Sequence, residues 1–146
     1  MFEHEKLQVY KLSRELNREI CRLTKIAAQG SYDHLDQLVR AGASITRNLA
    51  EGGGEWSPKE KAKFYRYAKR SAAEAAAALD VLVDYRMLRQ VDTDDAKNLL
   101  AQIIPMLVKL IQLFEGGAPN RPSKRNNDPS PSTSPDPKFR ARARSP

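Results

Sequence analysis

Hydrophobic side chains recur every three or four positions along residues 1–115, which is the spacing of one face of an α-helix. No segment alternates apolar and polar residues with the period of two that marks a half-buried β-strand. The pattern therefore predicts an all-α fold. We expect four helices, at about residues 5–27, 32–51, 57–88 and 92–115.

The ends of these segments carry residues that favour helix termini. Gly30 follows the first segment and suits the left-handed backbone that ends many helices. The run Gly52–Gly54 is expected to break the chain after the second segment. Ser57 and Glu60 match a capping box, in which each side chain accepts a hydrogen bond from the other residue's backbone amide. Acidic residues within 92–95 favour the start of the fourth helix.

Two helices have features that bear on packing. Gly42 lies on the apolar seam of the second helix, where its lack of a side chain indicates a close helix contact. Most residues of the stretch 99–114 are apolar, whereas a bundle helix needs only about three apolar positions per heptad. We therefore expect the fourth helix to be buried against another subunit through Leu107 or Ile111, and to be kinked at Pro105.

Length and hydropathy indicate one soluble domain. The chain has 146 residues, and its mean hydropathy is −0.63. The stretch 99–114 is shorter than the roughly 20 apolar residues that cross a bilayer, and residues 1–10 lack the apolar core of a signal peptide. The single cysteine, Cys21, cannot form an internal disulfide, which is typical of the reducing cytoplasm. We therefore expect a cytoplasmic protein.

Residues 116–146 differ sharply from the preceding domain, residues 1–115. They contain seven of the nine prolines and no Leu, Ile or Val, so they are expected to form a disordered tail. They also hold seven basic and two acidic residues, which is most of the net charge of +7. The tail is interpreted either as a solubilising segment or as a basic arm for nucleic acid. The basic residues of such an arm are Lys138, Arg140, Arg142 and Arg144.

Two helices carry a stripe of basic residues opposite their apolar seam. Cations at such spacing can follow a phosphate backbone, so two parallel stripes favour a nucleic-acid-binding protein. The alternative is that both stripes are ordinary solvated faces, balanced by nearby acidic residues. The stripes comprise Lys11, Arg14, Arg18, Arg22 and Lys25 in the first helix, and Lys59, Lys63, Arg66 and Arg70 in the third.

The sequence contains no recognisable catalytic or cofactor motif. Gly52–Gly54 is followed by Glu55, whereas a phosphate-binding loop requires a cation at that end. Two histidines and one cysteine are too few for a zinc site. His34 is expected to be merely exposed. We predict a protein that is not an enzyme, with no catalytic residues, no cofactor and no metal.

The segment 37–52 is the most specific part of the sequence. It reads Q-L-V-R-A-G-A-S-I-T-R-N-L-A-E-G, which resembles the signature Q-x-x-R-A-x-x-S-I-x-x-N-I-A-E-G of the proteins encoded in 23S ribosomal-RNA intervening sequences. The segment 64–74 resembles that family's F-x-x-x-A-x-G-S-x-x-E block, with Arg70 in place of the glycine. Residues 7–10 resemble the family's L-x-V-W/Y start.

The resemblance covers about residues 2–114 and implies an antiparallel, up-down four-helix bundle. It further implies a homo-oligomer, most simply a pentameric ring or barrel. The same superfamily includes the accessory variability determinants of diversity-generating retroelements, which bind nucleic acid and a reverse transcriptase. These properties are expectations drawn from the resemblance.

The matched residues also admit a purely structural interpretation. Polar side chains of the two signature segments are expected to meet between the second and third helices and to fix the helix register. In that case they belong to the scaffold and not to a binding site. The residues of this polar network are Arg40, Ser44, Asn48, Glu51, Ser71 and Glu74.

Two functions follow from the sequence. The first is a non-enzymatic oligomeric bundle that binds RNA or DNA through its basic faces, as an accessory subunit that also binds a reverse transcriptase. The alternative is a structural or protein-interaction module of the same family, with no direct role toward nucleic acid.

Overall fold

The computed structural model describes residues 3–116 of the chain, and the fold in this range is entirely helical. The all-α prediction with four long helices is confirmed. The helices are α1 (Gln8–Ile26), α2 (Tyr32–Gly54), α3 (Pro58–Asp84) and α4 (Asp94–Glu115), with short 3-10 helices η1 (Glu3–Lys6) and η2 (Gln90–Thr93).

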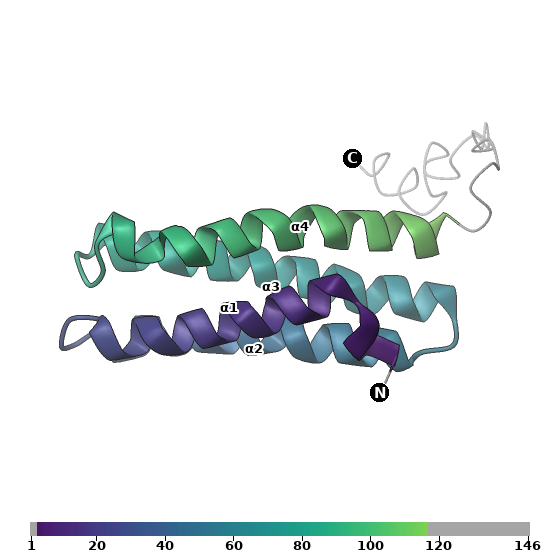
Figure 1. Cartoon of the computed structure of the whole chain (residues 1–146), viewed down its shortest axis with the longest axis horizontal. Coiled ribbons are helices and arrows are strands. Elements are labelled where there is room, and N and C mark those ends of the chain that lie inside the picture. The colour runs from purple at the N-terminus through teal and green to yellow at the C-terminus, as the bar shows by residue number, and fades with distance from the viewer. Residues whose placement is uncertain (1–2, 117–146) are drawn as a thin grey trace, which may run out of the picture.

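The four α-helices lie side by side as a bundle (Figure 1). α1 packs against α2 and α4, and α3 packs against the same two helices from the other side. α1 and α3 therefore lie diagonally across the core. At one end, the Ala28 amide donates to the Met87 carbonyl at 3.0 Å, so the α1–α2 connection lies beside the α3–α4 connection.

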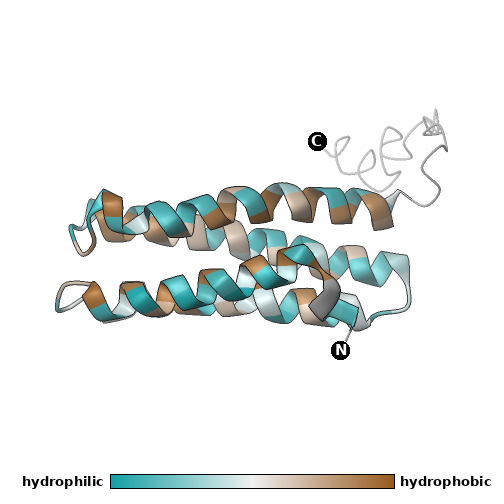
Figure 2. Cartoon of the chain, viewed as in Figure 1, coloured by the Kyte–Doolittle hydropathy of each residue, from teal (hydrophilic) through white to brown (hydrophobic). Residues whose placement is uncertain are grey.

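The seam predicted from the first helix forms one wall of the core. Leu16, Ile20 and Leu23 are at most 2% exposed. The facing part of α3 is built from small residues, of which Ala68 and Ala72 are fully buried. Hydrophobic residues line the inward sides of the helices and hydrophilic residues the outward sides (Figure 2). Burial of this apolar surface is the main force that holds the bundle together.

Gly42 makes the close contact that its place on the seam predicts. A Cβ atom at this position would lie 2.6 Å from Ile20 Cδ1 and 2.7 Å from Asn17 Oδ1, so α1 and α2 approach each other more closely than a side chain would allow. The expectation is confirmed.

The run Gly52–Gly54 does not break the chain, and that prediction was wrong. α2 continues through all three glycines. Tertiary packing explains the difference, because Gly52 lies under the ring of Tyr65 and Gly53 lies against His4. Contacts that only glycine permits outweigh the intrinsic cost of glycine in a helix, which is about 1 kcal/mol per residue.

Other helix ends follow the sequence in part. α1 ends at Ile26 and is followed by Ala27 in an extended conformation, so the expectation that Gly30 ends this helix is wrong. Gly30 is left-handed, with a φ of +87°, but it lies in the connection between α1 and α2. The Ser57 hydroxyl accepts a hydrogen bond from the Glu60 amide at 3.4 Å. The expected second hydrogen bond, from the Ser57 amide to the Glu60 side chain, does not form because the Glu60 carboxylate pairs with Lys63. α3 ends at Asp84, earlier than predicted, and the chain turns there through Arg86, which has a φ of +59°.

The apolar surface of α4 is covered more fully by its own chain than the sequence suggested. Leu107 and Ile111 are buried in the bundle, so the expectation that they face another subunit is wrong. They belong to the strip that α4 presents to α1 and α3. Leu113, in contrast, is 63% exposed. The helix runs unbroken through Pro105, which is exposed to solvent.

The segment Gln90–Glu115 is also long and apolar enough to cross a membrane. The core helix of a soluble protein meets the same criteria of length and composition, so this is weak support for a membrane span. Here Leu100, Ile103 and Leu107 are buried in the bundle, whereas most of the apolar stretch is not buried within the chain.

Candidate nucleic-acid interface

The outward face of α1 carries a row of exposed cations. All five basic residues of the predicted stripe are exposed, whereas the apolar seam on the other side of the helix is buried. Four of them have no hydrogen-bond or ion-pair partner within residues 3–116, so their charges face solvent. These four residues are Lys11, Arg14, Arg18 and Lys25.

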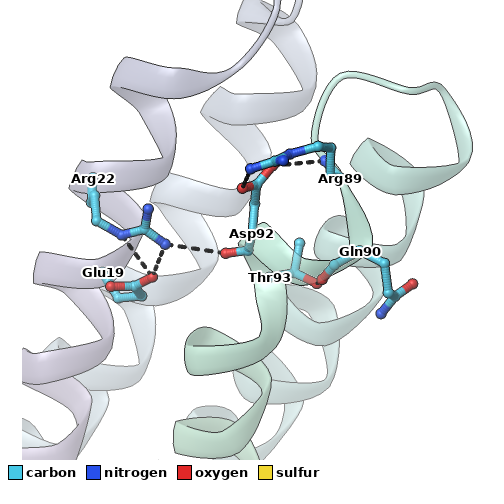
Figure 3. Close-up of polar contacts among 6 residues, drawn as sticks. All are labelled: Glu19, Arg22, Arg89, Gln90, Asp92 and Thr93. Carbon is cyan, nitrogen blue, oxygen red and sulfur yellow. Dashed lines mark hydrogen bonds and ion pairs between the residues drawn. The ribbon is translucent and has the colours of Figure 1, made fainter.

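Arg22, the fifth cation of the row, is held by hydrogen bonds within the chain. Its Nε donates to Glu19 Oε1 at 3.0 Å, and its Nη2 donates to the backbone carbonyl of Asp92 at 3.2 Å (Figure 3). The hydrogen bond with Glu19 raises the pKa of Arg22 above its usual value. Arg22 thus links α1 to η2, and it is less available to a phosphate than its neighbours.

A hollow opens beside the free cations, between α1 and α2. It has a volume of about 280 Å³ and is lined by Arg14, Asn17, Arg18, Cys21 and Thr46, with no carboxylate among these residues. Asn17 Nδ2 donates to Thr46 Oγ1 at 2.7 Å, which holds both side chains in place. Two arginines beside a neutral polar floor form an environment that suits an anion such as a phosphate group.

Asn17 and Thr46 were not among the residues singled out from the sequence. A signal for them exists, since each is a polar residue directly after a seam residue, Leu16 or Ile45, and therefore borders the core. Which helix they would meet depends on the packing of α1 against α2, and this is a tertiary property.

The basic stripe on α3 is more strongly paired. Lys63 Nζ lies 3.2 Å from the Glu60 carboxylate, and Arg66 Nη1 lies 3.2 Å from the carboxylate of Glu115 on α4. The hydrogen bond to Glu60 raises the pKa of Lys63. Lys59 has no partner within residues 3–116. Exposed pairs of this kind contribute only about 0–1 kcal/mol, so phosphates can replace the carboxylates at little cost.

The two stripes lie on opposite sides of the molecule. α1 and α3 are diagonal neighbours, and each stripe faces away from the shared core. A straight phosphate backbone can therefore reach only one stripe of a given chain. Phosphate binding by each stripe stays a prediction. The sequence specifies the face of each helix that carries a stripe, and the packing of the helices sets the direction in which that face points.

The predicted polar network forms only in part. Ser71 Oγ donates to Ser44 Oγ at 2.8 Å across α3 and α2, and Asn48 Nδ2 donates to the Ser44 carbonyl at 2.9 Å. Glu51 and Glu74 are exposed and have no polar partner in the described part of the chain. The expected six-residue network is thus reduced to three residues.

Arg40, the remaining member, pairs with Asp36 at 2.8 Å on its own helix. It lies, together with Arg47 and Glu74, along a shallow groove of about 600 Å³ between α2 and α3. Small residues such as Ala41 and Ala77 also line this groove, and it remains open because they leave space between the helices. The signature residues therefore reach the surface instead of a sealed interior.

The remaining residues considered in the sequence analysis lie away from this interface or outside the described part of the chain. Within residues 3–116, no group of three His, Cys, Asp or Glu side chains is placed to hold a metal ion. His34 is half-buried, and its ring stacks on Tyr85 at a centroid distance of 5.1 Å. The four basic tail residues, Lys138, Arg140, Arg142 and Arg144, lie beyond the described range.

Comparison with known protein families agrees with the signature in the sequence. The model of the family described as 23S rRNA-intervening sequence protein matches residues 5–109, which include all of α1, α2 and α3 and most of α4. A comparison with curated proteins finds no match.

Proposed function

The chain belongs to the 23S rRNA-intervening sequence protein family, and from this premise we propose that it is a non-enzymatic, nucleic-acid-binding bundle. The observation that carries the proposal is the outward face of α1. It has four cations without a partner in the described part of the chain, and a hollow without a carboxylate in its lining beside Arg14 and Arg18. A phosphate backbone supplies the anions that such a surface lacks. The hollow is shallow and open, so it can contact phosphates but does not enclose a base. Binding is therefore expected to be largely independent of the nucleotide sequence.

The proposal includes an antiparallel, up-down order of the helices and a homo-oligomer, most simply a pentamer. Short connections and the bond between Ala28 and Met87 support the helix order. Exposed apolar side chains, such as Leu113 at 63% and Val91 at 61%, support assembly. In an oligomer, each free α1 face is repeated, so weak phosphate contacts add up through avidity.

A narrower form of the proposal concerns the biological setting. We infer a cytoplasmic accessory subunit that binds a reverse transcriptase within a diversity-generating retroelement. The resemblance of the two signature segments and the basic faces support this setting. A reverse-transcriptase gene with template repeats beside the gene for this protein is the observation that tests it.

The second candidate is a structural or protein-interaction module without a nucleic-acid role. The ion pairs of Lys63 and Arg66 favour it, because they show that part of the basic surface is already neutralised within the chain. The two candidates differ in one measurable property, which is the response of binding to salt.

The decisive experiment is a fluorescence-anisotropy titration with labelled single-stranded RNA and duplex DNA between about 50 and 200 mM salt. Arg14→Gln with Arg18→Gln should lower the salt slope by roughly 0.7–0.9 for each phosphate that the protein no longer neutralises. Arg40→Gln is the control, since this arginine lies in the groove between α2 and α3 and not on the α1 face. Absence of binding by the wild type even at low salt would contradict the proposal and favour the structural module.

A further inference from the structure

Trp56 is the most exposed large hydrophobic residue in the described part of the chain. It is the single tryptophan of the sequence, and it is 97% exposed in the connection between α2 and α3. A ring of this size that faces water is a feature of interaction sites, because soluble proteins otherwise cover such surface.

The connection that carries Trp56 is held firmly. The Glu55 amide donates to the Gly52 carbonyl at 3.3 Å, and Lys61 Nζ donates to the carbonyls of Gly52 and Gly53 at 3.1 and 3.3 Å. These bonds join the end of α2 to the first turns of α3. The ring is therefore presented by a fixed backbone and does not need to be ordered when a partner binds.

Beyond Trp56, the outer face of α3 carries two lysines, then a tyrosine and an arginine. Lys59, Lys63, Tyr67 and Arg70 are four, four and three residues apart, so they share one side of the helix. Tyr67 is 40% exposed, and the Arg70 guanidinium lies 5.9 Å from the centre of its ring. We use the name aromatic–basic face for this side of α3, with Lys59, Lys63, Tyr67 and Arg70, together with Trp56 in the connection that precedes the helix.

The charge on this segment favours a polyanion. Residues 55–70 contain six basic side chains and two acidic ones. The α1 face carries cations without any exposed aromatic ring between them. Stacking surfaces and positive charge thus occur together on α3.

We propose that the aromatic–basic face binds unpaired nucleotides, with bases stacked on Trp56 and Tyr67 and phosphates next to Lys59, Lys63 and Arg70. This inference rests on the proposed function, and it adds a preference for single strands over duplex. Every base offers a π-face to a ring, whereas bases within a duplex are already stacked on one another. Because stacking does not read base edges, the preference for single strands comes without strong sequence selectivity.

The single tryptophan provides a direct test on the full-length protein. Titration with a single-stranded oligonucleotide should quench the fluorescence of Trp56, whereas a duplex of the same length should leave it nearly unchanged. Anisotropy with the same labelled strands measures the two affinities separately.

Variants identify the stacking contribution. Trp56→Ala should weaken single-strand binding by about 5- to 150-fold, and Trp56→Phe should restore most of the affinity because a flat ring remains. Duplex affinity should be the same in all three proteins. Tyr32→Ala is the matched control, since it removes a ring that is 79% exposed but lies outside the aromatic–basic face, and it should change neither affinity.

The outcomes separate this inference from the proposed function. If single strand and duplex bind equally and Trp56→Ala has no effect, the stacking inference is overturned while nucleic-acid binding stands. If Trp56→Ala instead reduces the oligomer mass and leaves single-strand affinity unchanged, Trp56 is a subunit contact and the inference is again overturned. If no nucleic acid binds at low salt, both proposals fail together.

Discussion

The ring of Tyr65 lies directly on the backbone of Gly52. A Cβ atom at Gly52 would be 2.7 Å from Tyr65 Cε1, which is closer than real Cβ contacts. Tyr65 is 2% exposed, its ring centre lies 5.8 Å from that of Phe114, and burial raises the pKa of its hydroxyl. One contact thus joins the end of α2 to α3 and α4.

Gly52→Ala should therefore destabilise the protein. The added methyl group forces the Tyr65 ring to move in a packed region, at a cost of about 1–3 kcal/mol in the free energy of unfolding. Chemical denaturation followed by circular dichroism measures this change. Gly54→Ala is the control, because nothing lies within 4 Å of a Cβ there, and it should be neutral or slightly stabilising. Equal stability of the two variants would contradict the packing that we describe.

The second prediction concerns the polar contact between α1 and α2. Thr46 Oγ1 accepts from Asn17 at 2.7 Å and donates to Ser13 Oγ at 3.0 Å, and Ser13 is fully buried. Thr46→Val keeps the shape but leaves Asn17 without its acceptor, so the free energy of unfolding should fall by about 1–3 kcal/mol.

A threonine on the surface of α1 supplies the control for this prediction. Thr24 Oγ1 donates only to the Cys21 carbonyl of its own helix, in an exposed position. Thr24→Val should change the free energy of unfolding by less than about 0.5 kcal/mol. A decrease for Thr46→Val no larger than that for Thr24→Val would show that the contact between the helices does not contribute.

The third prediction is a pH dependence at η2 (Figure 3). Asp92 accepts hydrogen bonds from the side chain and the backbone amide of Arg89, and these bonds lower the pKa of its carboxyl group. A lowered pKa in the folded state means that the stabilising contribution is complete above the ordinary aspartate value of about 3.9, and is lost as the pH falls through the folded value.

Asp92→Asn removes this ionisation and serves as the reference. The wild type should melt at a higher temperature than Asp92→Asn at pH 6, and the difference should shrink below about pH 4. Thermal melts of both proteins across this range test the sign. A difference that grows as the pH falls would contradict a lowered pKa of Asp92 in the folded state.

The fourth prediction concerns assembly through α4. Leu113 is 63% exposed, so Leu113→Asp should leave the fold of one chain intact, with a change below about 0.5 kcal/mol. If Leu113 contacts a second copy, light scattering should report a lower mass for this variant than for the wild type. Leu107→Asp, at a fully buried position, should instead unfold the chain. A wild type that is monomeric at micromolar concentration would contradict the assembly itself.

Local patterns in the sequence determine much of this protein. The seam from Val9 to Leu23, the left-handed Gly30 and the Ser57 cap follow from spacing and backbone preference, which act within a few residues. The family signature in residues 37–52 is also legible without a structure, since it depends on residue identity alone. The four helices could therefore be predicted with nearly correct limits.

Tertiary structure decided the features that depend on neighbours distant in the chain. Gly52 stays helical because the Tyr65 ring covers it, and Glu74 remains in solvent because α2 and α3 leave a groove there. The periodicity of a single helix states which residues share a face, but not the direction of that face. That direction, set by packing around a common core, places the basic stripes of α1 and α3 on opposite sides of the bundle.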